Sequence, residues 1–265
     1  MTDLLILHLT LAFLVGGAWV SIATLIAERY GSALGGLVGG FPAISIVSLL
    51  FIGINQGPET ASQATVVFPL ALSFTMTFLV IYAVLAKRGF REAFLVALLV
   101  WASLSIVTAI LNLRNLFFSV GVFLSVASFY FYILKMKMRL PHVGGAEVSC
   151  SVRQVTFRAF VGGGIIALAV LLSQLEGPLI GGIALSFPAI FSLTLFFTYR
   201  ARGMALSQAL AKPLLVSASL TAFPYSLFVG FLYPVLGEGI GTVVALSCTL
   251  PLVAFAHLLI NVKKI

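Results

Sequence analysis

Charge is scarce in this chain of 265 residues. Only 8% of its residues are charged and 61% are hydrophobic, whereas soluble domains carry about a quarter charged residues. So few charges cannot cover the surface of a soluble domain of this length. Several apolar runs reach about 20 residues, which is the length needed to cross a hydrocarbon core about 30 Å thick. The sequence therefore predicts an all-α integral membrane protein.

Cysteine and intramembrane carboxylates are scarce as well. The two cysteines, Cys150 and Cys248, have neither a disulfide pattern nor a metal-ligand spacing. No Asp or Glu lies in the middle of a predicted span, so a carboxylate proton relay has no carrier. No Walker motif, HExxH pair or nucleophile elbow is present. We therefore expect no enzyme activity, no metal, no other cofactor and no nucleic-acid partner.

Hydropathy predicts nine membrane-spanning helices. Their expected bounds are 4–26, 33–54, 65–86, 93–112, 116–134, 157–175, 178–198, 214–233 and 240–261. If the N-terminus faces outward, 14 of the 15 Lys and Arg residues fall on the inside, which accounts for the net charge of +8. We expect a multi-pass protein of the plasma (inner) membrane, in contact with membrane lipids, with its N-terminus outside and its C-terminus cytoplasmic.

The stretch 15–44 repeats without a gap at 161–190, with 12 identities in 30 positions. The repeat joins the first span to the sixth, and this odd offset inverts the second copy relative to the bilayer. The predicted organisation is repeat 1 at 1–115, a connector span and basic inside loop at 116–156, and repeat 2 at 157–265. Inverted repeats are typical of transporters, whose substrates bind near the membrane midplane at the repeat interface.

Each repeat carries a proline inside its second span. The two motifs are Gly39-Gly40-Phe41-Pro42 and Ser186-Phe187-Pro188. Proline removes one helical hydrogen bond and clashes with the carbonyl four residues back, so both helices are expected to break or kink here. Backbone groups freed at such a break can bind a solute. The alternative is a simple kink whose glycines allow close helix packing.

Hydroxyl and amide side chains form a second set of candidate substrate-binding residues. They comprise Ser62 and Gln63 with their counterparts Ser207 and Gln208, followed by Ser73 and Thr75 with their counterparts Ser219 and Thr221. The first group could line two vestibules or cap helix ends, because serine is a favoured N-cap residue. The second group could line the pathway or join helices by hydrogen bonds.

The paired glycines followed by an aromatic-proline helix, in a unit of four spans, resemble GlpM-like small membrane proteins. The resemblance rests on residues 31–86 and 177–233, and it implies two such units fused through the fifth span. More broadly, the inverted duplication resembles the drug/metabolite transporter group, although that group has five plus five helices. Neither resemblance implies a particular substrate.

These observations together predict a secondary transporter or facilitator for a small solute or ion, acting as a monomer or homodimer. Access to a site between the repeats would alternate as one repeat rocks against the other. Two alternatives stay open from the sequence: an ion channel with a fixed pore, and a lipid-binding or scrambling protein.

Overall fold

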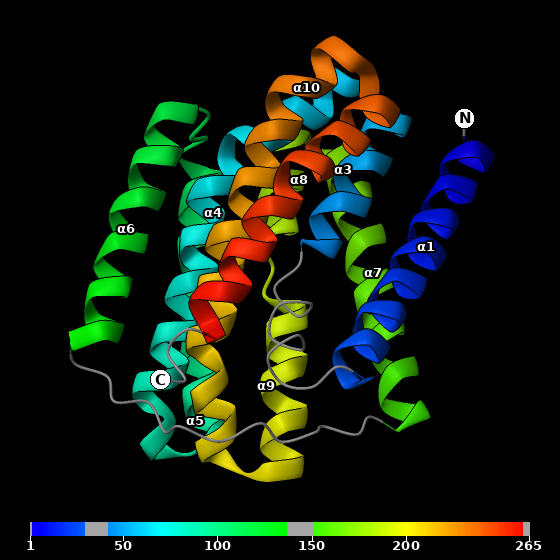
Figure 1. The fold of residues 1–265 in the computed structure, drawn as a ribbon. Coiled ribbons are helices and arrows are strands. Elements are labelled where there is room, and N and C mark those ends of the chain that lie inside the picture. The colour runs from blue at the N-terminus through cyan, green and yellow to red at the C-terminus, as the bar shows by residue number, and fades with distance from the viewer. Residues whose placement is uncertain (1, 30–41, 137–150, 262–265) are drawn as a thin grey trace.

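A computed structural model describes residues 2–29, 42–136 and 151–261 of the protein (Figure 1). Its helices are α1 Thr2–Arg29, α3 Ala43–Gln56, α4 Pro58–Leu85, the 3-10 helix η1 Ala86–Arg88, α5 Phe90–Ile110, α6 Leu116–Met136, α7 Val152–Glu176, α8 Pro178–Leu185, α9 Ala189–Arg202 and α10 Met204–Asn261. No strand occurs within these ranges. The expected all-helical fold is confirmed.

The described residues contain seven helical stretches long and apolar enough to cross a membrane. Large apolar side chains also face outward, such as Phe117, which is 89% exposed, together with Leu99 and Phe129. Contact with water would be unfavourable for so much apolar surface, whereas contact with lipid is not. The protein is a multi-pass helical membrane protein.

The last helix, α10, contains a reversal at Gly237. Its backbone there is not helical, with φ 75° and ψ 170°, and Figure 1 shows the chain folding back at this point. Glycine is suited to a positive φ because it has no Cβ to clash with the backbone. The segments before and after Gly237 therefore run in opposite directions.

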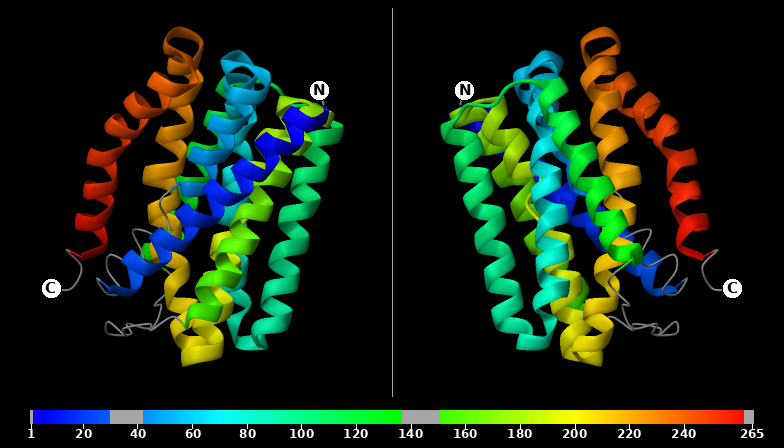
Figure 2. Two further views of the ribbon diagram at one scale, coloured as in Figure 1. Left: turned by 90° about the vertical axis from the view of Figure 1, so that its right-hand side faces the viewer. Right: turned by 90° about the vertical axis from the view of Figure 1, so that its left-hand side faces the viewer.

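Helices α1 and α7 lie side by side and run in opposite directions (Figures 1 and 2). Their contact uses glycine on both helices. A Cβ at Gly163 would lie 2.4 Å from the carbonyl oxygen of Phe13, and a Cβ at Gly17 would lie 3.0 Å from that of Ala159. Gly17 and Gly163 are counterparts in the sequence repeat, and each approaches the carbonyl of the residue four positions before the other. Glycine thus permits a close helix crossing, as small residues do in other membrane proteins.

Helix α4 lies at the centre of the bundle and packs against α3, α5, α6, α8 and α10. Its Phe68, Phe78 and Tyr82 are almost fully buried. The first segment of α10 runs antiparallel to α4 in Figure 1. We call the contact between α4 and the first segment of α10 the seam. The interrupted helices meet beside it.

Candidate functional site: a cavity between two interrupted helices

The expected span 178–198 is interrupted near its centre. Helix α8 ends at Leu185, and α9 begins only at Ala189. Between them, Pro188 has φ −77° and ψ 44°. The amide of Ser192 donates to the carbonyl of Pro188 over 2.7 Å, which starts the new helix. This span is therefore broken into two helices, because Pro188 cannot donate a hydrogen bond to the preceding turn.

The same geometry occurs at the equivalent proline of the first repeat. Helix α3 begins immediately after Pro42, whose φ is −76° and ψ is 45°. The amide of Ile46 donates to the carbonyl of Pro42 over 2.8 Å, as Ser192 does to Pro188. The predicted neighbours Gly39, Gly40 and Phe41 lie outside the described residues. Both prolines therefore occupy the N-cap position of a 14-residue helix.

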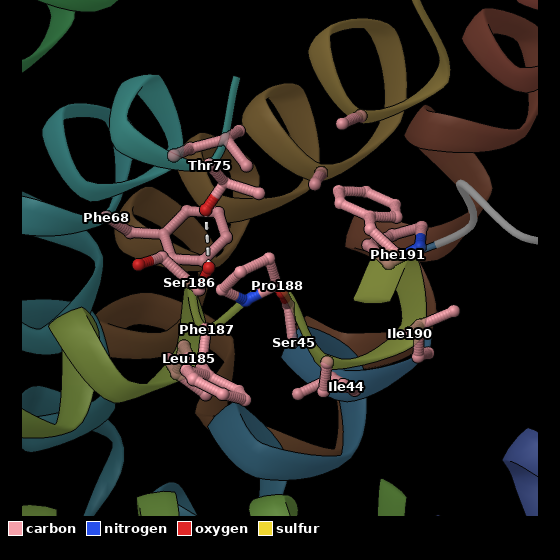
Figure 3. Close-up of a pocket in the computed structure, with 15 residues that line it drawn as sticks. Ile44, Ser45, Phe68, Thr75, Leu185, Ser186, Phe187, Pro188, Ile190 and Phe191 are labelled. Carbon is pink, nitrogen blue, oxygen red and sulfur yellow. Dashed lines mark hydrogen bonds between the residues drawn. The ribbon is translucent and has the colours of Figure 1, made fainter. Parts of the chain in front are cut away.

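One cavity of about 60 Å³ lies between the two helix starts (Figure 3). Its lining residues come from α3, α4, α8, α9 and α10: Pro42, Ile44, Ser45, Phe68, Leu72, Thr75, Leu185, Ser186, Phe187, Pro188, Ala189, Ile190, Phe191, Ala218 and Ala222. Two pairs of these residues are counterparts in the sequence repeat: Pro42 and Pro188, and Ile44 and Ile190. Equivalent positions of the two halves thus meet around one cavity.

Two of the three hydroxyl side chains in the cavity wall stabilise the break itself. The hydroxyl of Thr75 donates to the carbonyl of Ser186, and Figure 3 shows this bond between α4 and the α8–α9 break. The hydroxyl of Ser186 donates to the carbonyl of Ile183 over 2.8 Å. The first bond satisfies the carbonyl of Ser186, which has no other described partner. The second is an additional bond to the carbonyl of Ile183, which also accepts from the amide of Ser186.

The rest of the wall is apolar and partly aromatic. It includes Phe68, Phe187 and Phe191, and it contains no charged side chain within the described part of the chain. Outside the cavity, the ring of Trp101 packs edge-on against Phe187, with the ring centroids 5.1 Å apart. A ligand here would be recognised by backbone dipoles and hydroxyls rather than by an ion pair.

Ser62 and Ser207 lie away from the cavity and connect helices. The hydroxyl of Ser62 donates to the carbonyl of Gly230 over 2.6 Å. The hydroxyl of Ser207 lies 2.6 Å from that of Tyr82 and donates to the carbonyl of Leu195 over 2.8 Å. Neither serine caps its helix, because α4 and α10 begin at residues 58 and 204 and so place both serines inside a helix.

The adjacent glutamines differ from each other. The side chain of Gln208 donates to the carbonyl of Ala83 over 2.7 Å and so joins α10 to α4. Gln63 is exposed, with no described hydrogen bond from its side chain. Of this second set of candidates, the structure brings Thr75 alone to the cavity wall.

Ser73, Ser219 and Thr221 are buried outside the cavity wall. The hydroxyls of Ser73 and Ser219 donate to carbonyls of their own helices, those of Leu70 and Leu215 respectively. Thr221 donates to the carbonyl of Ser217 in the same way. Such bonds are common for hydroxyl residues inside helices, so these three side chains have a structural partner.

The sequence interpretation missed Ser45, which lies in the first turn of α3 and lines the cavity. Ser45 follows Pro42 by three residues, so a helix that restarts after Pro42 carries Ser45 in its first turn, close to the break. This spacing is the signal that could have identified it. It also missed the α4 and α10 wall, including Phe68, Leu72 and Ala222. These are ordinary apolar residues in sequence. Over the described ranges, no group of three or more His, Cys, Asp or Glu residues could hold a metal ion.

Comparison with known proteins yields one family match. Residues 9–113 are similar to the family described as Protein of unknown function (DUF3147). No curated protein and no solved structure matches the chain. The matched region begins within α1 and ends just after α5. It lends no support to the resemblance to GlpM-like proteins or to drug/metabolite transporters.

Proposed function

We propose that the chain is a secondary transporter or facilitator that moves a small solute across the membrane through this cavity. The observation that carries the proposal is the pairing of Pro42 and Pro188, which share one backbone geometry and line one cavity. Within a bilayer, interrupted helices are tolerated where their free backbone groups line a cavity. In transporters such interrupted helices build the substrate site.

Two inverted four-helix repeats, joined by a connector, would explain why the prolines meet. The antiparallel pairing of α1 with α7 and the reciprocal glycine contacts at their crossing support this arrangement. The family match supports it too, because residues 9–113 fall within the proposed first repeat, 1–115. On this interpretation α10 supplies two membrane spans that meet at Gly237, and the chain has nine spans in all.

Alternating access requires contacts that can open on one side of the cavity and hold on the other. The antiparallel seam between α4 and α10 offers such contacts at both ends. Ser62 bonds to the carbonyl of Gly230 near one end, and Gln208 bonds to that of Ala83 near the other. Rocking of one repeat against the other would break one set while keeping the second, and Thr75 would stay beside the cavity.

Charge distribution supports an orientation with the N-terminus outside. Among the described residues, the helix ends at the bottom of Figure 1 carry one acidic residue, Glu92, and six basic residues: Lys87, Arg88, Arg91, Arg153, Arg200 and Arg202. The opposite ends carry Glu59, Glu176 and Glu238, together with Arg114. Basic residues favour the cytoplasmic side, so we place the basic ends in the cytoplasm.

The proposal can be tested by a thermal-unfolding screen of the detergent-purified protein against small anions, cations and neutral solutes. A ligand at 100 times its dissociation constant stabilises the folded state by about 2.7 kcal/mol. We expect a solute that stabilises the protein, loses this effect in the Pro188→Ala variant, and crosses proteoliposome membranes with saturable kinetics. Stabilisation by anionic lipids alone, equal in the wild type and the variant, would contradict the proposal. Single-channel currents would favour a fixed pore instead.

A further inference from the structure

We infer that the solute recognised in this cavity is a small monovalent anion. The inference deepens the proposed transport function and depends on it. Three observations carry it: the first-turn backbone amides of two helices at the cavity, one hydroxyl in the cavity wall without a described partner, and the hydrogen bonds already made by most acceptors nearby.

The donors are backbone amides in the first turns of α3 and α9. Proline at the N-cap has no side-chain cap to offer, and neither helix has a capping hydrogen bond. The amides of Ile190 and Phe191 have no partner within the described part of the chain, and the same holds for those of Ile44 and Ser45. All four residues line the cavity. An acceptor in the cavity would satisfy the amides of Ile190 and Phe191, because the first amides of a helix have no partner within that helix.

The hydroxyl of Ser45 is an independent sign of a ligand. Ser45 is 4% exposed and lines the cavity, and no described residue accepts or donates a hydrogen bond to its side chain. Figure 3 shows Ser45 beside Pro188, at the meeting point of the two helix starts. Buried hydroxyls normally have a partner, and an acceptor bound in the cavity would supply one for Ser45.

Acceptors at the cavity are largely occupied, which disfavours a cation. Helix α8 ends here, but the carbonyls of Ile183 and Ala184 accept from the amides of Ser186 and Phe187. The carbonyl of Ser186 accepts from Thr75. A cation would need several free oxygen ligands in place of its hydration shell. Among the carbonyls of residues 183–187, only that of Leu185 has no described partner.

The magnitude of the helix dipoles favours a single negative charge. Each helix N-terminus acts as about half an elementary positive charge. The starts of α3 and α9 both face the cavity, so together they offset about one negative charge. The cavity volume of about 60 Å³ and the rings of Phe68, Phe187 and Phe191 limit the ligand to a small species.

The test compares two serine-to-alanine variants on one face of α3. Ser45→Ala removes the hydroxyl that lines the cavity. Ser48→Ala removes a hydroxyl one turn along the helix that is buried, has no described partner and lies outside the cavity wall. Both changes delete a hydroxyl without a described partner, so we expect both variants to fold. The probes are sodium chloride, sodium nitrate and sodium formate, with sodium gluconate at equal ionic strength as an anion too large for the cavity.

We expect at least one of the three small anions to raise the unfolding temperature relative to gluconate. In Ser45→Ala its dissociation constant should rise about tenfold or more, because a hydrogen bond to a charged group is lost. In Ser48→Ala it should be unchanged. Flux of the same anion into proteoliposomes should be lower in Ser45→Ala than in the wild type and unchanged in Ser48→Ala. Equal anion affinity in Ser45→Ala, Ser48→Ala and the wild type would overturn the assignment.

Two further outcomes separate this inference from the transport proposal. If choline or glycerol stabilises the protein and is transported, while no small anion does either, the anion inference is overturned and the transport proposal stands. If no solute of any charge stabilises the protein or crosses the membrane, both are overturned.

Discussion

Replacing Pro42 or Pro188 by alanine tests most directly whether the interrupted helices form the site. In Pro188→Ala, residue 188 gains an amide hydrogen directed at the carbonyl of Ala184. That carbonyl now accepts from the amide of Phe187 over 3.1 Å. Exchange of these bonds would let α8 continue into α9 as one helix and would move the amides of Ile190 and Phe191 out of the cavity. We expect the same consequence for Pro42→Ala in the first repeat.

The size of the effect follows from helix propensity. Proline is about 3 kcal/mol less favourable than alanine in a helix interior. Removing it therefore shifts the balance between broken and continuous helix by about a hundredfold toward the continuous form. If transport requires the broken form, solute flux should fall by about tenfold to a hundredfold in either variant. The unfolding temperature should not decrease, because the continuous helix makes more hydrogen bonds.

The assay is solute flux into proteoliposomes that contain equal amounts of wild-type or variant protein. Pro213→Ala is the matched control, because Pro213 lies inside α10 and outside the cavity wall. Its flux should stay within about twofold of the wild type. Wild-type flux in both Pro42→Ala and Pro188→Ala, with normal insertion, would refute the reasoning that the breaks form the site.

Two further predictions concern packing and hydrogen bonding in the same fold. Gly163→Val should lower the free energy of unfolding by about 1–3 kcal/mol, because its Cβ would lie 2.4 Å from the carbonyl oxygen of Phe13; Gly164→Val, with nothing within 4 Å, should be near neutral in the same denaturant titration. Thr75→Val should lower the free energy of unfolding by about 1–3 kcal/mol and reduce flux, because it leaves the buried carbonyl of Ser186 without a donor. Equal stability of the two glycine variants, or unchanged stability in Thr75→Val, would contradict these contacts.

Much of the helical framework could be predicted from hydropathy alone. The expected spans 93–112 and 116–134 correspond to α5 at Phe90–Ile110 and α6 at Leu116–Met136. Such agreement is expected for lipid-facing helices, because the thickness of the hydrocarbon core sets the length of the apolar run. The interruption at Pro188 was also predictable, since the effect of proline on a helix is local.

The cavity wall could not be read from the sequence in the same way. Ser62 and Ser207 stand out as polar residues near expected span ends, but α4 and α10 begin earlier than hydropathy indicates. Each serine is therefore about one turn inside its helix, where its hydroxyl reaches a neighbouring helix. Phe68 and Ala218 carry no distinguishing signal, because their role depends on how α4 and α10 are rotated against the break. Tertiary packing decides that rotation.

The central claim, that a solute reaches this cavity from the membrane faces, can be tested by cysteine accessibility. In a variant with Cys150→Ser and Cys248→Ser, Ala218→Cys places one thiol in the cavity wall. We predict that a small membrane-impermeant thiol reagent modifies it from either face in intact proteoliposomes. Ala245→Cys, buried in the second segment of α10 and outside the wall, should stay unmodified. Protection of Ala218→Cys from both faces would contradict the account.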